Sequence, residues 1–201
     1  MKVIIKTIFI SVFVLFVFVL VNALTHNPSV DQKLELISFT INEERAITHL
    51  SQSIEFKTIS NQQVSKKNSE EFEKFINWLK TNYKFVVKNT SLQTFNETLL
   101  FKWEGQDTSL KPILLTGHYD VVPVIPGTED KWKEPPFSGK IDSEYIWGRG
   151  ALDDKSGVIG ILEAVTYLME TGFQPSRTLY LSFGHDEEIG GVNGAALVAQ
   201  H

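Results

Sequence analysis

The sequence predicts an α/β fold, in which helices flank a central sheet. Short apolar stretches typical of strands occur at 98–103, 112–116 and 177–183. Between the last two of them, apolar side chains recur at helical spacing from Val158 to Met169. A strand, a helix and a second apolar strand in succession are typical of an α/β domain.

Two helices, a loop and a short strand are predicted ahead of these elements. Residues 41–58 carry apolar side chains at steps of three and four, which is typical of a helix. The polar stretch 61–68 predicts a loop. A second helix begins at Ser69, because this capping residue precedes two glutamates and an apolar stripe over 72–79. Apolar residues at 85–87 predict a short strand.

The second half of the chain alternates apolar elements with turns. The run 113–115 is fully apolar, as expected for a strand buried on both faces. The connection 121–139 contains four of the seven prolines, and a loop of this length is usually functional. A short strand is predicted at 145–147, and the Ala-rich stretch after Gly190 predicts a final helix.

The composition excludes several classes of protein. The 201 residues include 19 Lys and Arg against 24 Asp and Glu, so the net charge is -5 and we expect no nucleic-acid partner. The chain contains 0 cysteines, which excludes disulfides, Cys-bound zinc, iron–sulfur clusters and a cysteine nucleophile.

The N-terminal segment is typical of a secretory signal peptide. Lys2 and Lys6 precede an apolar stretch that ends in small residues. We therefore expect a signal peptide at 1–23, a leader or linker at 24–40, and a protein that is secreted or lies in the secretory pathway or vacuole lumen. The alternative is a membrane anchor at 7–24, although its strongly apolar part is shorter than the ~20 residues of a spanning helix. A membrane contact is expected only where this segment stays uncleaved.

Two glycosylation motifs agree with a secretory protein. The triplets Asn89-Thr90-Ser91 and Asn96-Glu97-Thr98 each match the N-glycosylation sequon. We therefore expect glycans on Asn89 and Asn96.

Three clusters of histidine and carboxylate residues lie beside predicted strands. They are His118-Tyr119-Asp120, Asp153-Asp154 and His185-Asp186-Glu187-Glu188. Taken singly, each has an ordinary structural explanation: a surface turn, a helix cap, or a solvated acidic turn. Taken together they are more specific, because strand ends converge on the ligand crevice of α/β sheets. Histidine and carboxylates without thiols suit zinc in a hydrolytic site, where a free glutamate can take a proton from water.

Four motifs in this order resemble the M20 family of metallopeptidases. They are Gly117–Pro123, Trp132 with 135–139, Trp147–Gly150 with 152–155, and Gly184–Glu188. Within the family they most resemble the branch that contains carboxypeptidase S and the N-fatty-acyl-amino-acid synthase/hydrolase. The resemblance covers residues 40–201 and implies a zinc-exopeptidase-like catalytic domain at 41–201. Its central sheet would be mixed, mainly parallel, and flanked by helices.

The resemblance also implies a site with two zinc ions. His118 would bind one ion, Glu188 the other, and Asp153 would bridge both. Glu187 would be the general base, and Asp120 would orient His118 through its second ring nitrogen. Relatives carry a cis peptide bond between Asp153 and Asp154. The implied activity is hydrolysis of amide bonds in peptides with a free C-terminus or in N-acyl amino acids.

The family pattern extends beyond His201, the last residue. It requires another carboxylate ligand, a distal histidine ligand, and an inserted lid or dimerisation domain through which a homodimer would form. We therefore expect a truncated catalytic domain, the N-terminal portion of a longer protein, that binds zinc weakly alone. Two alternatives stay open: a di-zinc aminopeptidase of another family, and a non-catalytic truncated product that at most binds metal weakly or binds a partner.

Overall fold

The computed structural model describes residues 2–26, 39–63 and 69–201. These residues form two units, Met1–Phe39 and Thr40–His201. The first contains α1, Lys2–Thr25, whose apolar side chains are exposed on every side. The 23 residues Val3–Thr25 have the length and composition to cross a membrane. A 24-residue helix is about 36 Å long, against about 30 Å for the bilayer core.

The apolar helix is therefore longer than the sequence suggested. It is compatible with a signal peptide or with an anchor, because a signal sequence near the N-terminus passes the same test of length and composition. The predicted leader falls mostly on residues 27–38, which lie outside the described residues.

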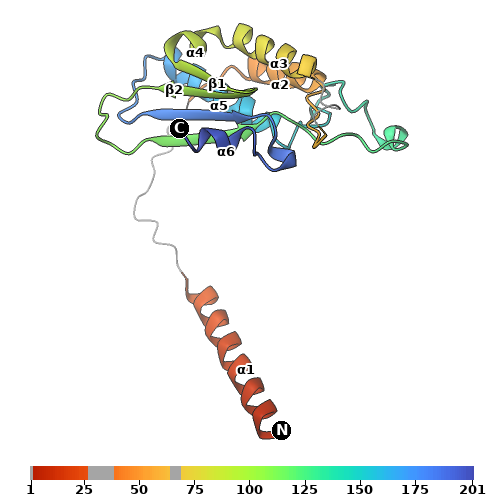
Figure 1. Ribbon diagram of the computed structural model, residues 1–201, viewed down its shortest axis with the longest axis vertical. Helices are drawn as coiled ribbons and strands as arrows, with labels where there is room; N and C mark the ends of the chain where they lie inside the picture. The colour runs from red at the N-terminus through yellow and green to blue at the C-terminus, as the bar shows by residue number, and fades with distance from the viewer. Residues whose placement is uncertain (1, 27–38, 64–68) are drawn as a thin grey trace. The chain divides into compact units, whose positions relative to one another are not determined.

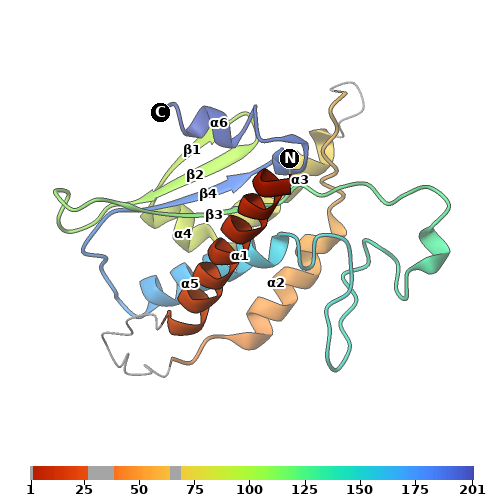
Figure 2. The same cartoon turned by 90° about the horizontal axis from the view of Figure 1, so that it is seen from below.

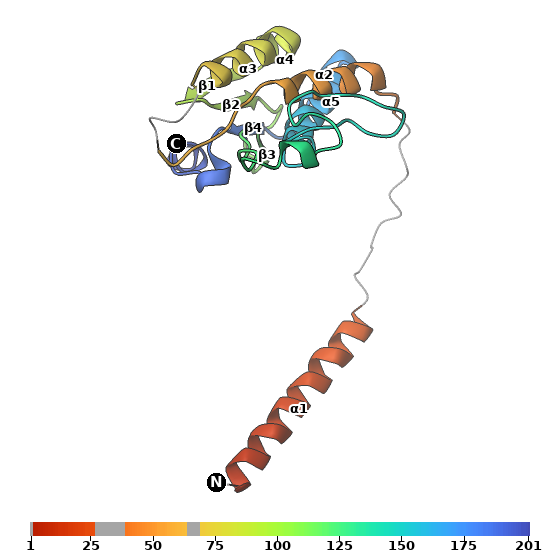
Figure 3. The ribbon, with the colours of Figure 1, turned by 90° about the vertical axis from the view of Figure 1, so that its right-hand side faces the viewer.

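The second unit is a four-stranded sheet with helices on both faces (Figure 1). Figure 3 shows α2 to α5 on one face and the blue C-terminal segment, which contains α6, on the other. In chain order the elements are α2 (Glu43–Glu55), α3 (Ser69–Asn82), α4 (Lys84–Asn89), β1 (Ser91–Phe95), β2 (Thr98–Trp103), β3 (Ile113–His118), η2 (Glu129–Lys131), α5 (Lys155–Glu170), β4 (Leu179–Gly184), η3 (Glu187–Ile189) and α6 (Ala195–Val198).

The sheet is mixed, as predicted, with the strand order β1-β2-β4-β3 (Figure 2). β3 and β4 are parallel and are joined through α5, which packs against β3. β1 pairs with β2, and β2 with β4, in antiparallel register. The expectation of a mainly parallel sheet is therefore wrong for the described strands, because two of the three pairings are antiparallel.

The core lies between the sheet and the helices α3, α4 and α5. The apolar stripe of α3 is buried as predicted, at Phe72, Phe75, Ile76 and Leu79. These side chains pack with inward residues of β2, β4 and α5 in one continuous cluster. The helix prediction succeeds here because this stripe at helical spacing is the only apolar face that α3 can bury.

A buried polar network joins α2 to α5. Glu163 Oε1 accepts hydrogen bonds from Tyr83 Oη and pairs with His49 Nδ1, both at 2.7 Å. Glu163 Oε2 accepts a third from Arg45 Nε, also at 2.7 Å. Since Glu163 is 5% exposed, this network fixes the position of α2 on the long helix α5.

Two predicted strands are wrong. Residues 85–87 lie in α4, where Val86 is buried and Val87 N donates to Tyr83 O, so the chain simply continues from α3 as a helix. Residues 145–147 form no strand, and a single bridge joins Ile146 to Ile141. In both cases the local run of apolar residues is typical of a strand, but packing against the rest of the protein favours a different backbone conformation.

The burial expected for the strand at 112–116 is also wrong. Leu114 of β3 is 57% exposed, whereas a strand buried on both faces would hide it. β3 is the last strand in the sheet, and α5 covers one of its faces. The other face of β3 is open within the described residues.

Candidate metal centre

The clusters expected to bind metal meet at one edge of the sheet. His118 is the last residue of β3, and Glu187 and Glu188 open η3, which begins three residues after the end of β4. Asp153 lies two residues before α5, the helix that joins these two strands. Because β3 and β4 are parallel neighbours, their carboxyl ends lie side by side and bring the clusters together.

Three side chains have the spacing of metal ligands. His118, Asp153 and Glu188 each offer one ligand atom, and these atoms all lie within 4.8 Å of one another. His118 Nε2 lies 3.0 Å from Asp153 Oδ1 and 3.7 Å from Glu187 Oε2. An imidazole and two carboxylates are a donor set that fits a divalent ion such as zinc.

The burial of these groups is uneven. His118 is 8% exposed, whereas the side chains of Asp153 and Glu187 are 75% and 62% exposed. A cavity of about 330 Å³ adjoins them, and its lining includes Gly117, His118, Asp154 and Glu187. His118 is therefore buried on one side of the site, and the exposed carboxylates lie on the side that is open to solvent. This arrangement suits a catalytic metal, which needs a coordination position that substrate can reach.

Asp120 connects the two strand ends. Its carboxylate is fully buried, and Oδ1 lies 3.3 Å from His118 Nδ1. The same carboxylate accepts hydrogen bonds from the backbone N–H groups of Glu187 and Glu188, both at 3.1 Å. It therefore orients the imidazole so that Nε2 faces the acidic residues, as outer carboxylates do in many metal sites.

The charges of the site shift the pKa values of its members. Burial opposes a charged His118, but the hydrogen bond and charge of Asp120 outweigh it and raise the pKa of His118 to about 9. Burial also opposes a charged Asp120, yet its bonds to His118 and the Glu188 N–H hold its pKa below the usual range. Burial and the neighbouring Asp153 charge raise the pKa of Glu188. A cation would relieve this crowding of carboxylates.

The structure separates the third sequence cluster into two halves. Glu187 and Glu188 lie at the site, whereas His185 and Asp186 are each 3% exposed, although Asp186 also lines the cavity beside Glu187. His185 Nδ1 is 2.7 Å from Thr98 Oγ1, and Asp186 Oδ2 accepts a hydrogen bond from Asn193 N at 2.7 Å. In the tight turn after β4, successive side chains point in different directions. The residue types alone do not predict these directions.

Asp154 belongs to the second cluster, for which a helix cap is the alternative explanation, and it is the N-cap residue of α5 without a capping hydrogen bond from its side chain. Its Oδ2 accepts a hydrogen bond from His118 N at 3.3 Å, so it joins the start of α5 to the end of β3. A Cβ at Gly157 or Gly117 would lie 2.4 or 2.9 Å from its carboxylate oxygens. These two glycines are the sequence signal for this close packing. The Asp153–Asp154 peptide bond is cis, as the resemblance implied.

Lys155 belongs to the motif at 152–155, but its burial and its partners were not predicted. The side chain is fully buried, and Nζ donates to Ser53 O at 2.7 Å and to Phe56 O at 2.8 Å. Burial lowers the pKa of Lys155 to about 7. A lysine at the start of a helix is ordinarily solvated, so the sequence carries no signal for this burial.

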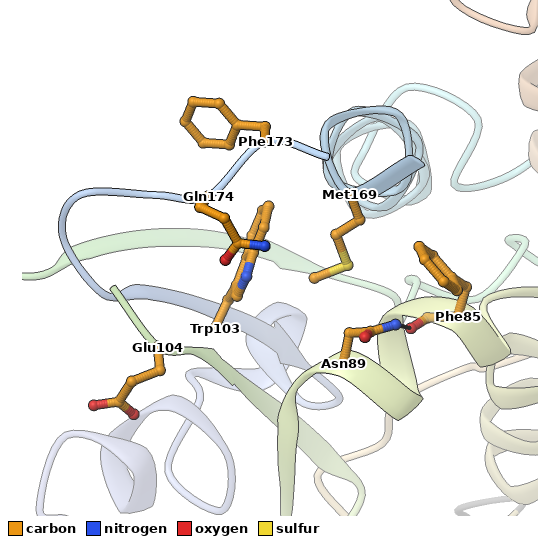
Figure 4. A pocket seen from close by; sticks show the side chains of 7 residues that line it. All are labelled: Phe85, Asn89, Trp103, Glu104, Met169, Phe173 and Gln174. Carbon is orange, nitrogen blue, oxygen red and sulfur yellow. Dashed lines mark hydrogen bonds between the residues drawn. The ribbon is translucent and has the colours of Figure 1, made fainter. Parts of the chain in front are cut away.

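A second hollow, of about 290 Å³, lies at the far end of α5 (Figure 4). Figure 4 shows Trp103, Met169 and Asn89 around a common space. Glu104 is the one ionisable residue among those that line it, and it pairs with Lys102 at 2.6 Å. This hollow therefore has no constellation for acid–base or metal chemistry.

The two sequon asparagines are both exposed. Asn89 ends α4, and Asn96 lies in the turn between β1 and β2 with a positive φ of 52°. Glycosylation at either position stays a prediction.

The fold resembles that of a solved dipeptidase. The crystal structure of human carnosine dipeptidase 1 superimposes with a TM-score of 0.65 at 19% identity, covering 79% of this chain and 35% of that one. Residues 114–201 match the model of Peptidase family M20/M25/M40, and this segment belongs to that family, which confirms the resemblance.

Curated relatives agree with this family. Probable carboxypeptidase S-like 2 of Dictyostelium discoideum is 42% identical over 200 residues, which are 96% of this chain and 38% of that protein. N-fatty-acyl-amino acid synthase/hydrolase PM20D1 of Xenopus tropicalis is 48% identical over 101 residues, 50% of this chain and 19% of that protein. The chain thus spans well under two thirds of these relatives.

Proposed function

We propose that the protein containing this chain is a zinc-dependent hydrolase of amide bonds, acting on peptides with a free C-terminus or on N-acyl amino acids. The observation that carries the proposal is the convergence of His118, Asp153 and Glu188 within 4.8 Å at the edge of the sheet. The substrate classes are those in the names of the carboxypeptidase S-like and N-fatty-acyl-amino acid hydrolase relatives.

In this proposal two ions share the site. His118 would hold one ion and Glu188 the other, and Asp153 would be a ligand of both. Zinc held in this way would polarise the substrate carbonyl and lower the pKa of a nearby water. Asp120 keeps the ring of His118 in place, because its carboxylate faces Nδ1 and leaves Nε2 to the acidic side.

Glu187 is the proposed general base. Its carboxylate is exposed and lies 3.7 Å from His118 Nε2, so it faces the same space as the ligands. It takes a proton from the attacking water as the new C–O bond forms, and returns it to the nitrogen as the C–N bond breaks. Both steps need a carboxylate that is close to the ions without binding them.

Glu187→Gln in the full-length protein tests this role. The amide keeps the shape of the side chain but cannot accept the proton, so turnover should fall by ~10²–10⁴-fold while metal content is unchanged. Glu134→Gln is the matched control, because Glu134 is a partly buried carboxylate paired with Lys140 outside the site. Turnover by Glu187→Gln within a few-fold of wild type would contradict the assignment.

The protein is also proposed to enter the secretory pathway. The support is α1, which has the composition of a signal peptide or anchor, together with two exposed sequons. Lys2 and Lys6 at its start favour an N-terminus that stays in the cytoplasm and a lumenal hydrolase unit.

A further inference from the structure

The ammonium group of Lys155 is anchored on the last turn of α2. Its two acceptors are Ser53 O in the last turn of α2 and Phe56 O at the C-cap, which also accepts a hydrogen bond from Thr58 N at 3.0 Å. The negative end of the helix dipole favours a cation at this point. Nζ also lies 5.3 Å from the ring centroid of Phe75. These contacts compensate an ammonium group that is removed from water.

The loop that carries Asp153 is folded tightly around this side chain. Lys155 N donates to Gly150 O at 3.0 Å, which closes the loop. A Cβ at Gly150 would lie 2.7 Å from Val121 Cγ1 and 3.4 Å from Lys155 Cδ. A Cβ at Gly148 would lie 2.3 Å from Ile54 Cγ2 of α2. The loop therefore has little freedom to move relative to α2 while Lys155 is in place.

Asp153 depends on this loop for its position. Its side chain is 75% exposed, and the partner it reaches is His118, another proposed ligand. The anchor itself is rigid, because Glu163 holds α2 on α5 through His49 and Arg45. Backbone placement therefore decides how far the Asp153 carboxylate lies from His118 before any ion binds.

We propose that Lys155 is a positioning residue of the metal centre. Its ammonium group, fixed to the end of α2, sets the position of Asp153 relative to His118 and thereby the affinity for metal. Lys155 touches neither substrate nor metal in this role. The inference rests on the metal centre of the proposed function and adds the group that holds its bridging ligand.

Lys155→Met in the full 201-residue chain, kept in detergent because α1 is apolar, tests the inference. Titration with Co²⁺ should show a 10–100-fold loss of affinity, the size expected for removal of a group that orients ligands. The visible absorption of bound Co²⁺ should also change, since the coordination geometry is altered. Val165→Ala is the control for lost stability, because Val165 is buried in α5, ten residues beyond Lys155. It should leave the Co²⁺ affinity and spectrum unchanged.

Chemical rescue gives a second readout. The chain contains 0 cysteines, so Lys155→Cys introduces a single thiol that can be alkylated in the unfolded chain. Bromoethylamine restores an ammonium at nearly the original length, whereas iodopropane gives a side chain of the same length without charge. The first product should recover the Co²⁺ affinity after refolding and the second should not. Equal affinities of the two products would overturn the proposal.

Three further outcomes are decisive. If wild type binds no Co²⁺, the proposed metal centre fails and the inference fails with it. If wild type binds Co²⁺ and Lys155→Met matches it within about threefold with the same spectrum, the positioning role alone is overturned. If Lys155→Met does not fold, the two alkylated products of Lys155→Cys decide, because they have the same length and differ in charge.

Discussion

At the scale of single residues, Asp120 determines how the proposed metal centre is assembled. One buried carboxylate faces His118 Nδ1 and also accepts the backbone N–H groups of Glu187 and Glu188. The imidazole at the end of β3 and the acidic turn after β4 are therefore held by a common acceptor. Ligands that come from distant parts of the sequence keep their relative positions through this residue.

The proposed bridging role of Asp153 leads to a comparison of two variants. Asp153→Ala should lose more metal than His118→Ala, because a bridge serves both ions and a terminal ligand serves one. Metal quantification of the two variants at equal protein concentration measures the difference. Equal losses, or full retention in Asp153→Ala, would contradict a bridge.

Glu71 gives a prediction for stability against pH. The backbone N–H of Lys57 donates to Glu71 Oε2 at 2.9 Å, and this bond lowers the pKa of Glu71. A lowered carboxyl pKa stabilises the fold above the ordinary value of ~4.3, and this contribution is lost as pH falls through the lowered pKa. Glu71→Gln should therefore be less stable than wild type at pH 7, by about 1 kcal/mol.

Urea unfolding at neutral and acidic pH measures this effect. The difference between wild type and Glu71→Gln should shrink as the pH falls below the lowered pKa, because both side chains are then neutral. Glu70→Gln is the control, since Glu70 forms only an exposed pair with Lys74 on the same helix. A difference that is constant with pH would show that the Glu71 charge plays no part.

At this scale the sequence predicted the proposed ligands and Asp120 beside His118, but not the contacts of Lys155. His118, Asp153 and Glu188 stand out because titratable side chains gather at strand and helix ends. The contacts of Lys155 could not be predicted, because its partners are backbone carbonyls at the end of α2, about a hundred residues away along the chain. Backbone acceptors have no residue type, so no motif marks them.

At the scale of elements, the helices and strands with the clearest periodic pattern of apolar residues were the ones predicted correctly. α3 and α5 carry apolar stripes at helical spacing, and both were predicted. β1 was missed, because Ser91–Phe95 is a largely exposed edge strand with few apolar residues. α4 was mistaken for a strand, because six residues that include two adjacent valines favour a strand unless a preceding helix continues into them.

The N-terminal helix and the sequons give a prediction of their own. In secretory cells, Asn89→Gln and Asn96→Gln should each remove one glycan, visible as a step in gel mobility, and the double variant should carry none. Deletion of residues 2–25 should abolish both, because the chain then stays in the cytosol. Asn77→Gln, outside any sequon, is the control. Unchanged mobility in the double variant would contradict the glycosylation prediction.

At the scale of the whole unit, the sheet has one well-covered face and one largely open face. Helices α3 to α5 lie over the first face, and α6 lies over the second (Figure 2). A hollow of about 510 Å³ lies beside α6. Leu114, Leu100 and Tyr180 line this hollow. An edge strand with exposed apolar side chains is a site of self-association.

Leu114→Lys should therefore make the 201-residue chain less prone to aggregate. The added charge lies on an exposed edge strand and should oppose pairing with a second sheet. Static light scattering against concentration measures the change. Ile125→Lys is the control, because Ile125 is 69% exposed in a loop away from the sheet. Equal improvement by both variants would attribute the effect to net charge and not to the open face.

Topology explains which features of the whole unit were predictable. The βαβ unit of β3, α5 and β4 follows from sequence, since apolar strands on either side of a helix have one common arrangement. The position of β2 beside β4 does not, because a pairing across some eighty residues of chain leaves no local pattern. A mixed sheet was predicted, but which strands pair in antiparallel register was for this reason not.

The position of Thr98 also sets an order of events during synthesis. Its hydroxyl is buried against His185, which follows it by 87 residues, and it completes the sequon of Asn96. A transferase that must reach both Asn96 and Thr98 can act only before β4 arrives beside β2. At roughly 5–20 residues per second, translation of the intervening chain takes about 4–17 s. The fraction of chains that carry a glycan on Asn96 should therefore depend on the rate of translation. Asn89 lies at the end of an exposed helix, so its modification has no such time limit.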